Sequence, residues 1–326
     1  ETERIHIQMK IHKKRWYVVL VIIIALLIGD ISFFIMGKFF PNKLNEGNTQ
    51  LPTPSEQLIT TQNNIKQGIK DIKLNSPYAI LIDLEDQSIL YEKNADKKIY
   101  PASLTKIMSC VVALDHINDL NQKVTVTEKD LEGLAEANAS VAGLQPGDKV
   151  TYEDLLYALV LPSGADAANV LANNLCGDMK SFVQEMNNKA KAYGMVNTHF
   201  MNATGLHDDN HYTTMQDLKQ MMKHAWINTA FQKVLTTTKY EIPSIKLKFK
   251  STLLLYGDSL SFDGGEIIGG KSGYTLEAEC CLVSVAKMKD GHLYMFISAK
   301  APGEPLSDHK HIDDAKHMYE QVSKSK

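Results

Sequence analysis

A serine and a lysine three positions apart form the first candidate for chemistry in this sequence. Ser103 and Lys106 lie in the stretch YPASLTKIMSC, directly after Pro101 and Ala102. The residues from 103 to about 117 are predicted to be helical, and positions i and i+3 share one face of a helix. A serine hydroxyl is a weak nucleophile unless a base takes its proton. A buried lysine loses its charge more easily, so Lys106 could be that base.

The spacing alone is weak evidence, because Ser-x-x-Lys occurs at three more places. Ser284 and its lysine fall in a predicted strand, where i and i+3 point to opposite faces. Ser307 is predicted to cap the last helix, and Ser323 lies at the C-terminal end of the sequence. Of the four pairs, the one at Ser103 is therefore best placed for catalysis.

Two further stretches supply groups that could hold a substrate. LPSGADAAN places Ser163 on a turn before a predicted helix, and GGKSGYT places Lys271, Ser272, Gly273 and Tyr274 on a predicted strand. The order Ser-x-x-Lys, Ser-Gly-x, Lys-Ser-Gly is the signature of penicillin-recognising serine enzymes.

The sequence resembles the low-molecular-weight penicillin-binding proteins, which are serine D-alanyl-D-alanine carboxypeptidases. The resemblance runs from about Ser76 to Gln321. It includes IYPASLTKIMS, LLYALVLPSGADAANVLA, FVQEMNNKAKAYGMVNTHFMNATGL and GGKSGYT. So much matching text makes a chance resemblance very improbable.

The resemblance implies a catalytic group of Ser103, Lys106 and Ser163. Ser103 would attack the peptide carbonyl between two D-alanines, Lys106 would take its proton, and Ser163 would relay a proton to the leaving D-alanine. It implies no metal ion and no cofactor. The implied substrate is a peptidoglycan stem peptide ending in D-Ala-D-Ala, and β-lactam antibiotics would acylate Ser103 as inhibitors.

The resemblance also implies a substrate-binding strand of Lys271, Ser272, Gly273 and Tyr274. Lys271 and Ser272 would bind the terminal carboxylate of the substrate. The backbone N–H groups of Ser103 and Tyr274 would form the oxyanion hole, each donor contributing ~3 kcal/mol.

The sequence departs from the family pattern in two of the motifs. The third residue of the second motif is usually asparagine, and here it is Ala165; Ser272 replaces the commoner threonine but keeps a hydroxyl. The first departure leaves a weakly active or non-catalytic penicillin-binding paralogue as an alternative. A serine β-lactamase is a further alternative, suggested by residues 185–188, although these fall inside a predicted amphipathic helix.

Composition limits the remaining classes of function. The chain has 326 residues, a formal net charge of -3 and 44% hydrophobic residues. Because basic residues gather only near the N-terminus, a nucleic-acid binder is not expected. The four cysteines, Cys110, Cys176, Cys280 and Cys281, match no disulfide or zinc pattern and are expected to be small apolar fillers.

The N-terminal residues predict a membrane anchor. Lys13, Lys14 and Arg15 precede an almost wholly apolar segment at 16–40, which as a helix would extend ~37 Å. The basic flank should stay inside, which makes this a single-pass protein of the cell membrane with everything after residue 40 outside the cytoplasm. A cleaved signal peptide is the alternative.

Strand patterns at both ends of the globular part and helical patterns between them predict an α+β fold. By the resemblance, the fold is that of β-lactamases and DD-peptidases, with an antiparallel sheet packed by helices and a helical subdomain. The expected organisation is a cytoplasmic basic tail at 1–15, a transmembrane anchor at 16–40, a linker at 41–75 and a DD-peptidase catalytic domain at 76–326.

Overall fold

The computed structural model describes residues 69, 72–256, 259–304 and 308–325. The basic tail and the membrane span predicted at 16–40 lie outside these residues. Within the described part, no helix has both the length and the apolar character needed to cross a membrane.

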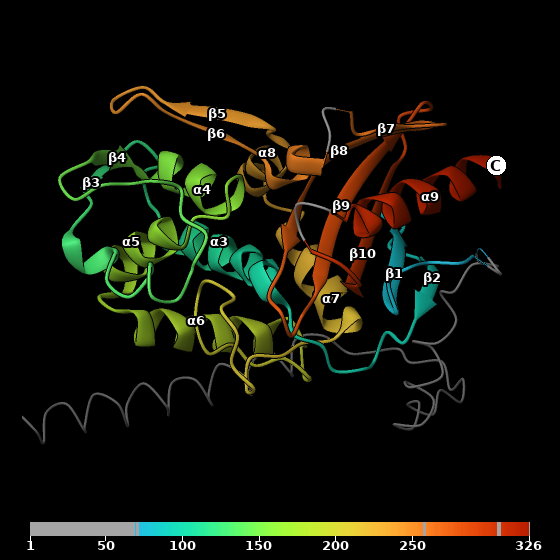
Figure 1. The fold of residues 1–326 in the computed structure, drawn as a ribbon, viewed down its shortest axis with the longest axis horizontal. Helices are drawn as coiled ribbons and strands as arrows, with labels where there is room; N and C mark the ends of the chain where they lie inside the picture. Colours follow the sequence, from blue (N-terminus) through green and yellow to red (C-terminus); the bar gives the residue numbers. More distant parts are fainter. Residues whose placement is uncertain (1–68, 70–71, 257–258, 305–307, 326) are drawn as a thin grey trace, which may run out of the picture. The chain divides into compact units, whose positions relative to one another are not determined.

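A six-stranded antiparallel sheet built from both ends of the described chain forms one half of the fold (Figure 1). The strand order is β2-β1-β10-β9-β8-β7. The strands are β1 (Tyr78–Asp83), β2 (Ile89–Lys93), β7 (Ser261–Phe262), β8 (Gly265–Gly273), β9 (Cys280–Met288) and β10 (Leu293–Ala301). The predicted α+β class with an antiparallel sheet is confirmed.

Helices cover both faces of this sheet. The C-terminal helix α9 (Lys310–Lys324) packs on β9 and β10, while α7 (Met215–Ala225) packs on β1 and β10 and α8 (Thr229–Thr236) on β8. Side chains alternate along β9: Val283 and Val285 join the core on the side of α7 and α8, and Leu282 and Ala286 join the core under α9. This alternation follows from the two-residue period of a strand.

The remaining helices form a second half beside the sheet (Figure 1). They are α3 (Thr105–His116), α4 (Tyr152–Val160), α5 (Ala165–Cys176) and α6 (Met179–Ala192). Two small antiparallel sheets accompany them, β3 (Lys123–Thr125) with β4 (Lys149–Thr151) and the hairpin of β5 (Lys239–Ile242) with β6 (Leu247–Lys250). The 3-10 turns are η1 (Ala102–Leu104), η2 (Glu128–Asp130) and η3 (Thr252–Tyr256).

Local sequence signals fix several helix ends. Thr151 and Asp154 form the predicted capping box at the start of α4. Gly177 ends α5 with φ of +84°, a conformation that glycine adopts without steric cost.

Three expectations differ from the structure. Ser103 lies in the 3-10 turn η1, directly before α3, and not in the α-helix itself. The segment YEIPSIKLKF forms the separate β5–β6 hairpin, because its Pro-Ser pair makes a turn, and α8 was not predicted. The N-cap residue of α9 is His309, and Ser307, the predicted cap, lies outside the described residues.

The cysteines behave as apolar fillers. Cys110, Cys280 and Cys281 are buried, Cys176 is half-buried, and all four are free thiols. Burial raises the pKa of the Cys110 thiol to about 12, so it stays protonated and unreactive at neutral pH.

Candidate active site

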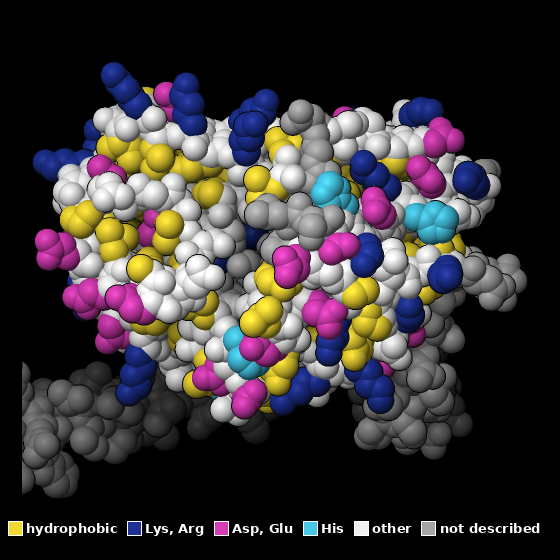
Figure 2. All heavy atoms as spheres, in the orientation of Figure 1, with side chains coloured by type: hydrophobic (Ala, Val, Ile, Leu, Met, Phe, Trp, Pro, Cys, Tyr) yellow, Lys and Arg dark blue, Asp and Glu magenta, His cyan; other side chains and the backbone are white. Residues whose placement is uncertain are grey.

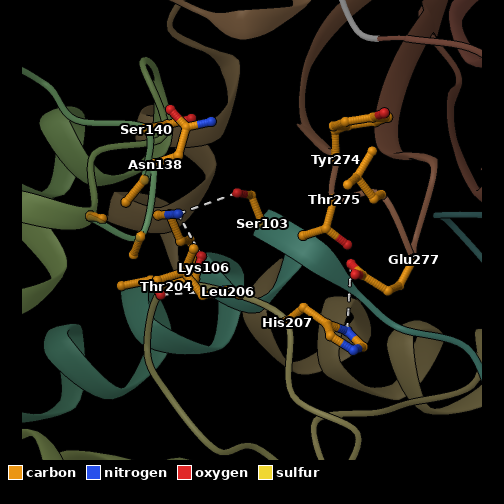
Figure 3. A pocket seen from close by; sticks show the side chains of 15 residues that line it. Ser103, Lys106, Asn138, Ser140, Thr204, Leu206, His207, Tyr274, Thr275 and Glu277 are labelled. Atoms are coloured by element: carbon orange, nitrogen blue, oxygen red, sulfur yellow. Dashed lines mark hydrogen bonds and ion pairs between the residues drawn. The ribbon is translucent and has the colours of Figure 1, made fainter. Parts of the chain in front are cut away.

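Ser103 and Lys106 meet at the junction between η1 and α3. The Nζ of Lys106 donates a hydrogen bond to the Oγ of Ser103 over 3.2 Å (Figure 3). Because η1 runs directly into the first turn of α3, the i, i+3 spacing places both side chains on one side of the chain. The predicted pair is thus a direct contact.

Lys106 is held in place by a second contact and by burial. Its Nζ also donates to the carbonyl oxygen of Thr204 over 2.5 Å, and its side chain is only 2% exposed. Loss of hydration lowers the pKa of Lys106 to about 7, although the charge of Asp166 acts to raise it. In a large share of the molecules, the Lys106 side chain is therefore neutral at neutral pH, as a general base must be.

The carbonyl of Thr204 is presented by a tight turn that Asn202 organises. The Oδ1 of Asn202 accepts from the backbone N–H of Thr204 and of Gly205, and its Nδ2 donates to the Leu206 carbonyl. Gly205 has φ of +84°, and a Cβ there would lie 2.0 Å from the carbonyl oxygen of Ala102. The turn thus packs directly behind the nucleophile. Sequence reasoning missed its role, although the Asn-Ala-Thr-Gly signal of a turn was present.

Lys271 lies on β8 as a second buried lysine. It is fully buried, and its Nζ donates to the carbonyl of Ser272 over 2.6 Å. Burial, and then the nearby Lys106, lower its pKa well below the ordinary value for lysine. The neighbouring Ser272 hydroxyl donates to the Oγ1 of Thr252 on η3 over 2.8 Å, which fixes its orientation. Thr252 was not predicted.

The end of β8 runs against the nucleophile. A Cβ at Gly273 would lie 2.8 Å from the backbone nitrogen of Ser103, so the strand approaches this closely only because residue 273 is glycine. The next residue, Tyr274, lines the same pocket as Ser103. The end of β8 and the nucleophile therefore border one pocket.

Ser163 is buried on the turn before α5 and is not part of the Ser103–Lys106 hydrogen bond. It is 4% exposed, has φ of +67°, and its Oγ makes no hydrogen bond within the described residues. A positive φ is uncommon for a residue with a side chain and costs of the order of 1 to 3 kcal/mol. Two positions on, the methyl group of Ala165 lines the pocket.

Asp166 holds in place the segment that forms the wall of the pocket opposite Tyr274. Its carboxylate accepts backbone hydrogen bonds from Ala142, Gly143 and Leu144, at 2.9 to 3.1 Å, and one from Ala167 at 2.9 Å. The segment that it binds leads into the pocket through Ser140, whose carbonyl accepts from the N–H of Ala165 over 2.8 Å. A buried aspartate at the start of a helix gave no sequence signal for this role.

The pocket that these elements enclose has a volume of about 560 Å³. Ser103 and Lys106 line it, and Tyr274 lies across from Asn138 and Ser140 (Figure 3). This volume is in the range of small-molecule and peptide sites. Four predicted residues are thus close together in the site: Ser103, Lys106, Gly273 and Tyr274.

One edge of the pocket carries an acid–histidine contact. The Nδ1 of His207 lies 3.8 Å from a carboxylate oxygen of Glu277. The ring of Tyr100 packs edge-on against the same imidazole, with 4.7 Å between the ring centroids. Beyond the pocket, the described basic and acidic side chains are interspersed over the face in Figure 2. A continuous basic surface of the kind that binds nucleic acid is not seen on that face.

Comparison with curated proteins finds several D-alanyl-D-alanine carboxypeptidases. DacF of Bacillus subtilis (strain 168) is 32% identical over 209 residues, covering 64% of this chain and 53% of that protein. The D-alanyl-D-alanine carboxypeptidase of Streptomyces sp. (strain K15) is 35% identical over 208 residues, covering 60% of this chain and 71% of that protein. The match thus spans about half the length of DacF.

Solved structures agree with this relationship. The crystal structure of the Streptomyces K15 DD-transpeptidase superimposes with a TM-score of 0.69 and 30% sequence identity, covering 77% of this chain and 98% of that one. Residues 62–298 match the peptidase S11 family, which is described as D-alanyl-D-alanine carboxypeptidase. Because this match covers well over half of the sequence, the chain belongs to the D-alanyl-D-alanine carboxypeptidase family.

Proposed function

We propose that this protein is a serine D-alanyl-D-alanine carboxypeptidase that removes the terminal D-alanine from peptidoglycan stem peptides. The observation that carries the proposal is the contact between Ser103 and the buried Lys106, both of which line the pocket. A nucleophile with an adjacent, partly deprotonated base is what acyl transfer from a peptide requires.

The first step forms an acyl-enzyme at Ser103. When Lys106 is neutral, the Ser103 hydroxyl donates to its nitrogen, because one amine hydrogen remains on the Thr204 carbonyl and the lone pair is free. As the Ser103 oxygen attacks the carbonyl carbon of the penultimate D-alanine, its proton passes to Lys106. The N–H groups of Ser103 and Tyr274 then donate to the developing oxyanion.

Collapse of the tetrahedral intermediate breaks the C–N bond and releases D-alanine. Its nitrogen takes up the proton held by Lys106, with the Ser163 hydroxyl as the relay. Water then attacks the ester carbonyl and Lys106 accepts a proton from that water. As the bond between the acyl carbon and the Ser103 oxygen breaks, Lys106 returns the proton to that oxygen, and the shortened peptide leaves. The free hydroxyl of Ser163 supports the relay role, since its hydrogen-bonding capacity is not used within the described residues.

The substrate carboxylate would lie beside Lys271 and Ser272. In the free protein both lysines are buried, and the nearby Lys106 disfavours a charge on Lys271. A bound carboxylate adds a negative charge that favours protonated Lys271. Substrate binding would then place the positive charge on Lys271 and leave Lys106 neutral as the base.

The apolar segment at 16–40 is proposed to anchor the chain in the cell membrane, with the catalytic domain outside the cytoplasm. The basic residues before it and its length support this orientation. Peptidoglycan lies on that side of the membrane, where β-lactams would reach Ser103.

The decisive experiment combines labelling and turnover. The full chain in detergent, and its Ser103→Ala variant, would be incubated with a fluorescent penicillin and the label located by mass spectrometry. Release of D-alanine from diacetyl-Lys-D-Ala-D-Ala would be measured in parallel, with and without an amine acceptor.

Label on Ser103 with D-alanine release supports the proposal. Rapid loss of the label indicates a β-lactamase, and label without release indicates a weakly active paralogue. Absence of label in the parent chain would overturn the proposal.

A further inference from the structure

The pocket has an amide on the wall opposite β8. Among the residues that line it, Asn138 is the one with a side-chain amide, a neutral group that can both donate and accept. In Figure 3 Asn138 and Ser140 lie on one side of Ser103, and Tyr274 and Thr275 lie on the other. A peptide bound with its scissile carbonyl at Ser103 would therefore pass between these two walls.

The backbone of Asn138 is fixed even though its side chain is exposed. Its N–H donates to the Ala135 carbonyl over 3.0 Å, and the N–H of Ala139 donates to the Leu134 carbonyl over 2.9 Å. Residue 138 has φ of +47°, which asparagine tolerates better than most residues. The bond from Ala165 to Ser140 then ties this segment to α5. The amide is thus presented from a determined position.

No hydrogen bond of the described residues involves the Asn138 amide. Ala165, on the same wall, offers only a methyl group. A peptide running past Ser103 exposes the amide group on the acyl side of the scissile bond, which needs partners once water is displaced. Lys106 is already bonded to Ser103 and Thr204. On that wall Asn138 carries the side-chain amide, which can donate and accept at once, and the Ser140 hydroxyl lies beside it.

We propose that Asn138 binds the backbone amide on the acyl side of the scissile bond and so determines which acyl donors react quickly. The inference rests on the proposed function, because it assumes acylation of Ser103. The chemical class it selects is a donor with a secondary amide next to the reactive carbonyl. D-Ala-D-Ala peptides and acylamino penicillins have this group, and 6-aminopenicillanic acid lacks it.

The test compares acylation of the full chain by benzylpenicillin and by 6-aminopenicillanic acid, followed by intact-mass spectrometry. For Asn138→Ala we expect acylation by benzylpenicillin to slow about fivefold to tenfold, the value of one neutral hydrogen bond, with 6-aminopenicillanic acid unaffected. Asn188→Ala is the matched control, because Asn188 is an exposed asparagine on α6 outside the pocket. It should change neither rate.

A rescue variant separates recognition from a general effect on the loop. Asn138→Ala combined with Ala165→Asn returns an amide to the same wall, and we expect it to recover most of the lost rate with benzylpenicillin. Equal slowing with both penicillins, or no slowing with either, would overturn the role of Asn138. If the parent chain reacts with neither compound, the proposed function itself fails, a result distinct from both.

Discussion

A side chain at position 273 would collide with the backbone nitrogen of Ser103. The Cβ of such a residue would lie 2.8 Å from that nitrogen and 3.2 Å from both the Cβ of Ala102 and the nitrogen of Leu104. All three atoms belong to η1, the turn that carries the nucleophile. A side chain at position 273 would therefore push Ser103 and the end of β8 apart. The distance between β8 and η1 therefore sets the position of Ser103 and of its N–H.

Replacing Gly273 by alanine should damage acylation more than stability. We expect Gly273→Ala to lower the second-order rate constant for acylation by benzylpenicillin at least ~100-fold, the loss typical of one oxyanion donor. Circular dichroism should still show a folded protein. Gly291→Ala is the control: Gly291 has φ of +90° in a turn where a Cβ meets nothing within 4 Å. That variant should lose some stability and keep its acylation rate, and equal rates for the two variants would contradict the role of Gly273.

The pH dependence of acylation should follow the ionisation of Lys106. Burial lowers its pKa to about 7, so the charged form dominates below that pH and cannot accept the Ser103 proton. The acylation rate constant should rise about tenfold per pH unit below 7 and level off above it. Stopped-flow or mass-spectrometric rates between pH 5 and 9 would measure this. A limb centred near pH 10, where an ordinary lysine titrates, would show that Lys106 is not the base.

The sequence was informative where function depends on side chains close together in the chain. Ser103 and Lys106 are three residues apart, so their contact follows from one helical turn. A sheet built from both ends of the chain also followed from the strand patterns there, and its antiparallel order followed from the resemblance. In contrast, the same patterns could not tell that YEIPSIKLKF pairs with itself, because partner choice depends on packing far away in sequence.

The features of the site that the sequence did not predict were missed for a common physical reason: they depend on the folded arrangement of the chain. The acceptor that holds Lys106 is the backbone carbonyl of Thr204, and a carbonyl has no residue-type signature. The effect of Lys106 on the pKa of Lys271 arises only when the fold brings α3 beside β8. Asn138 belongs to an irregular segment whose place depends on Asp166, so neither residue could be recognised from spacing.

Replacing Ser163 by glycine should raise the stability of the protein and lower its activity. Its φ of +67° suits glycine better than serine, and its buried Oγ is not bonded within the described residues. We expect Ser163→Gly to raise Tm by ~2 to 4 °C, equivalent to about 1 kcal/mol, while D-alanine release slows strongly. Lys246→Gly relieves a similar φ of +54° on the exposed β5–β6 turn and should stabilise without affecting turnover. Full activity in Ser163→Gly would exclude the relay role.

Asp166 should be required for both the pocket wall and the charge balance of the base. Its carboxylate accepts four backbone N–H bonds, and asparagine offers only one oxygen, so an amide N–H₂ would face donors. We expect Asp166→Asn to lower the free energy of unfolding by ~3 kcal/mol. It should also move the rising limb of the acylation pH profile to lower pH, because the charge that raises the Lys106 pKa is removed.

Asp148→Asn provides the matched comparison for Asp166. Asp148 accepts one backbone hydrogen bond, from Gln145 over 2.8 Å, in the turn that follows the same segment. Its replacement should cost ~1 kcal/mol or less and leave the pH profile in place. Chemical denaturation and rate profiles of the two variants separate the effects. If Asp166→Asn were destabilised but kept its pH limb unchanged, the carboxylate would hold the wall without influencing Lys106. If both variants lost equal stability, the four-bond network would not be the reason that this wall stays in place.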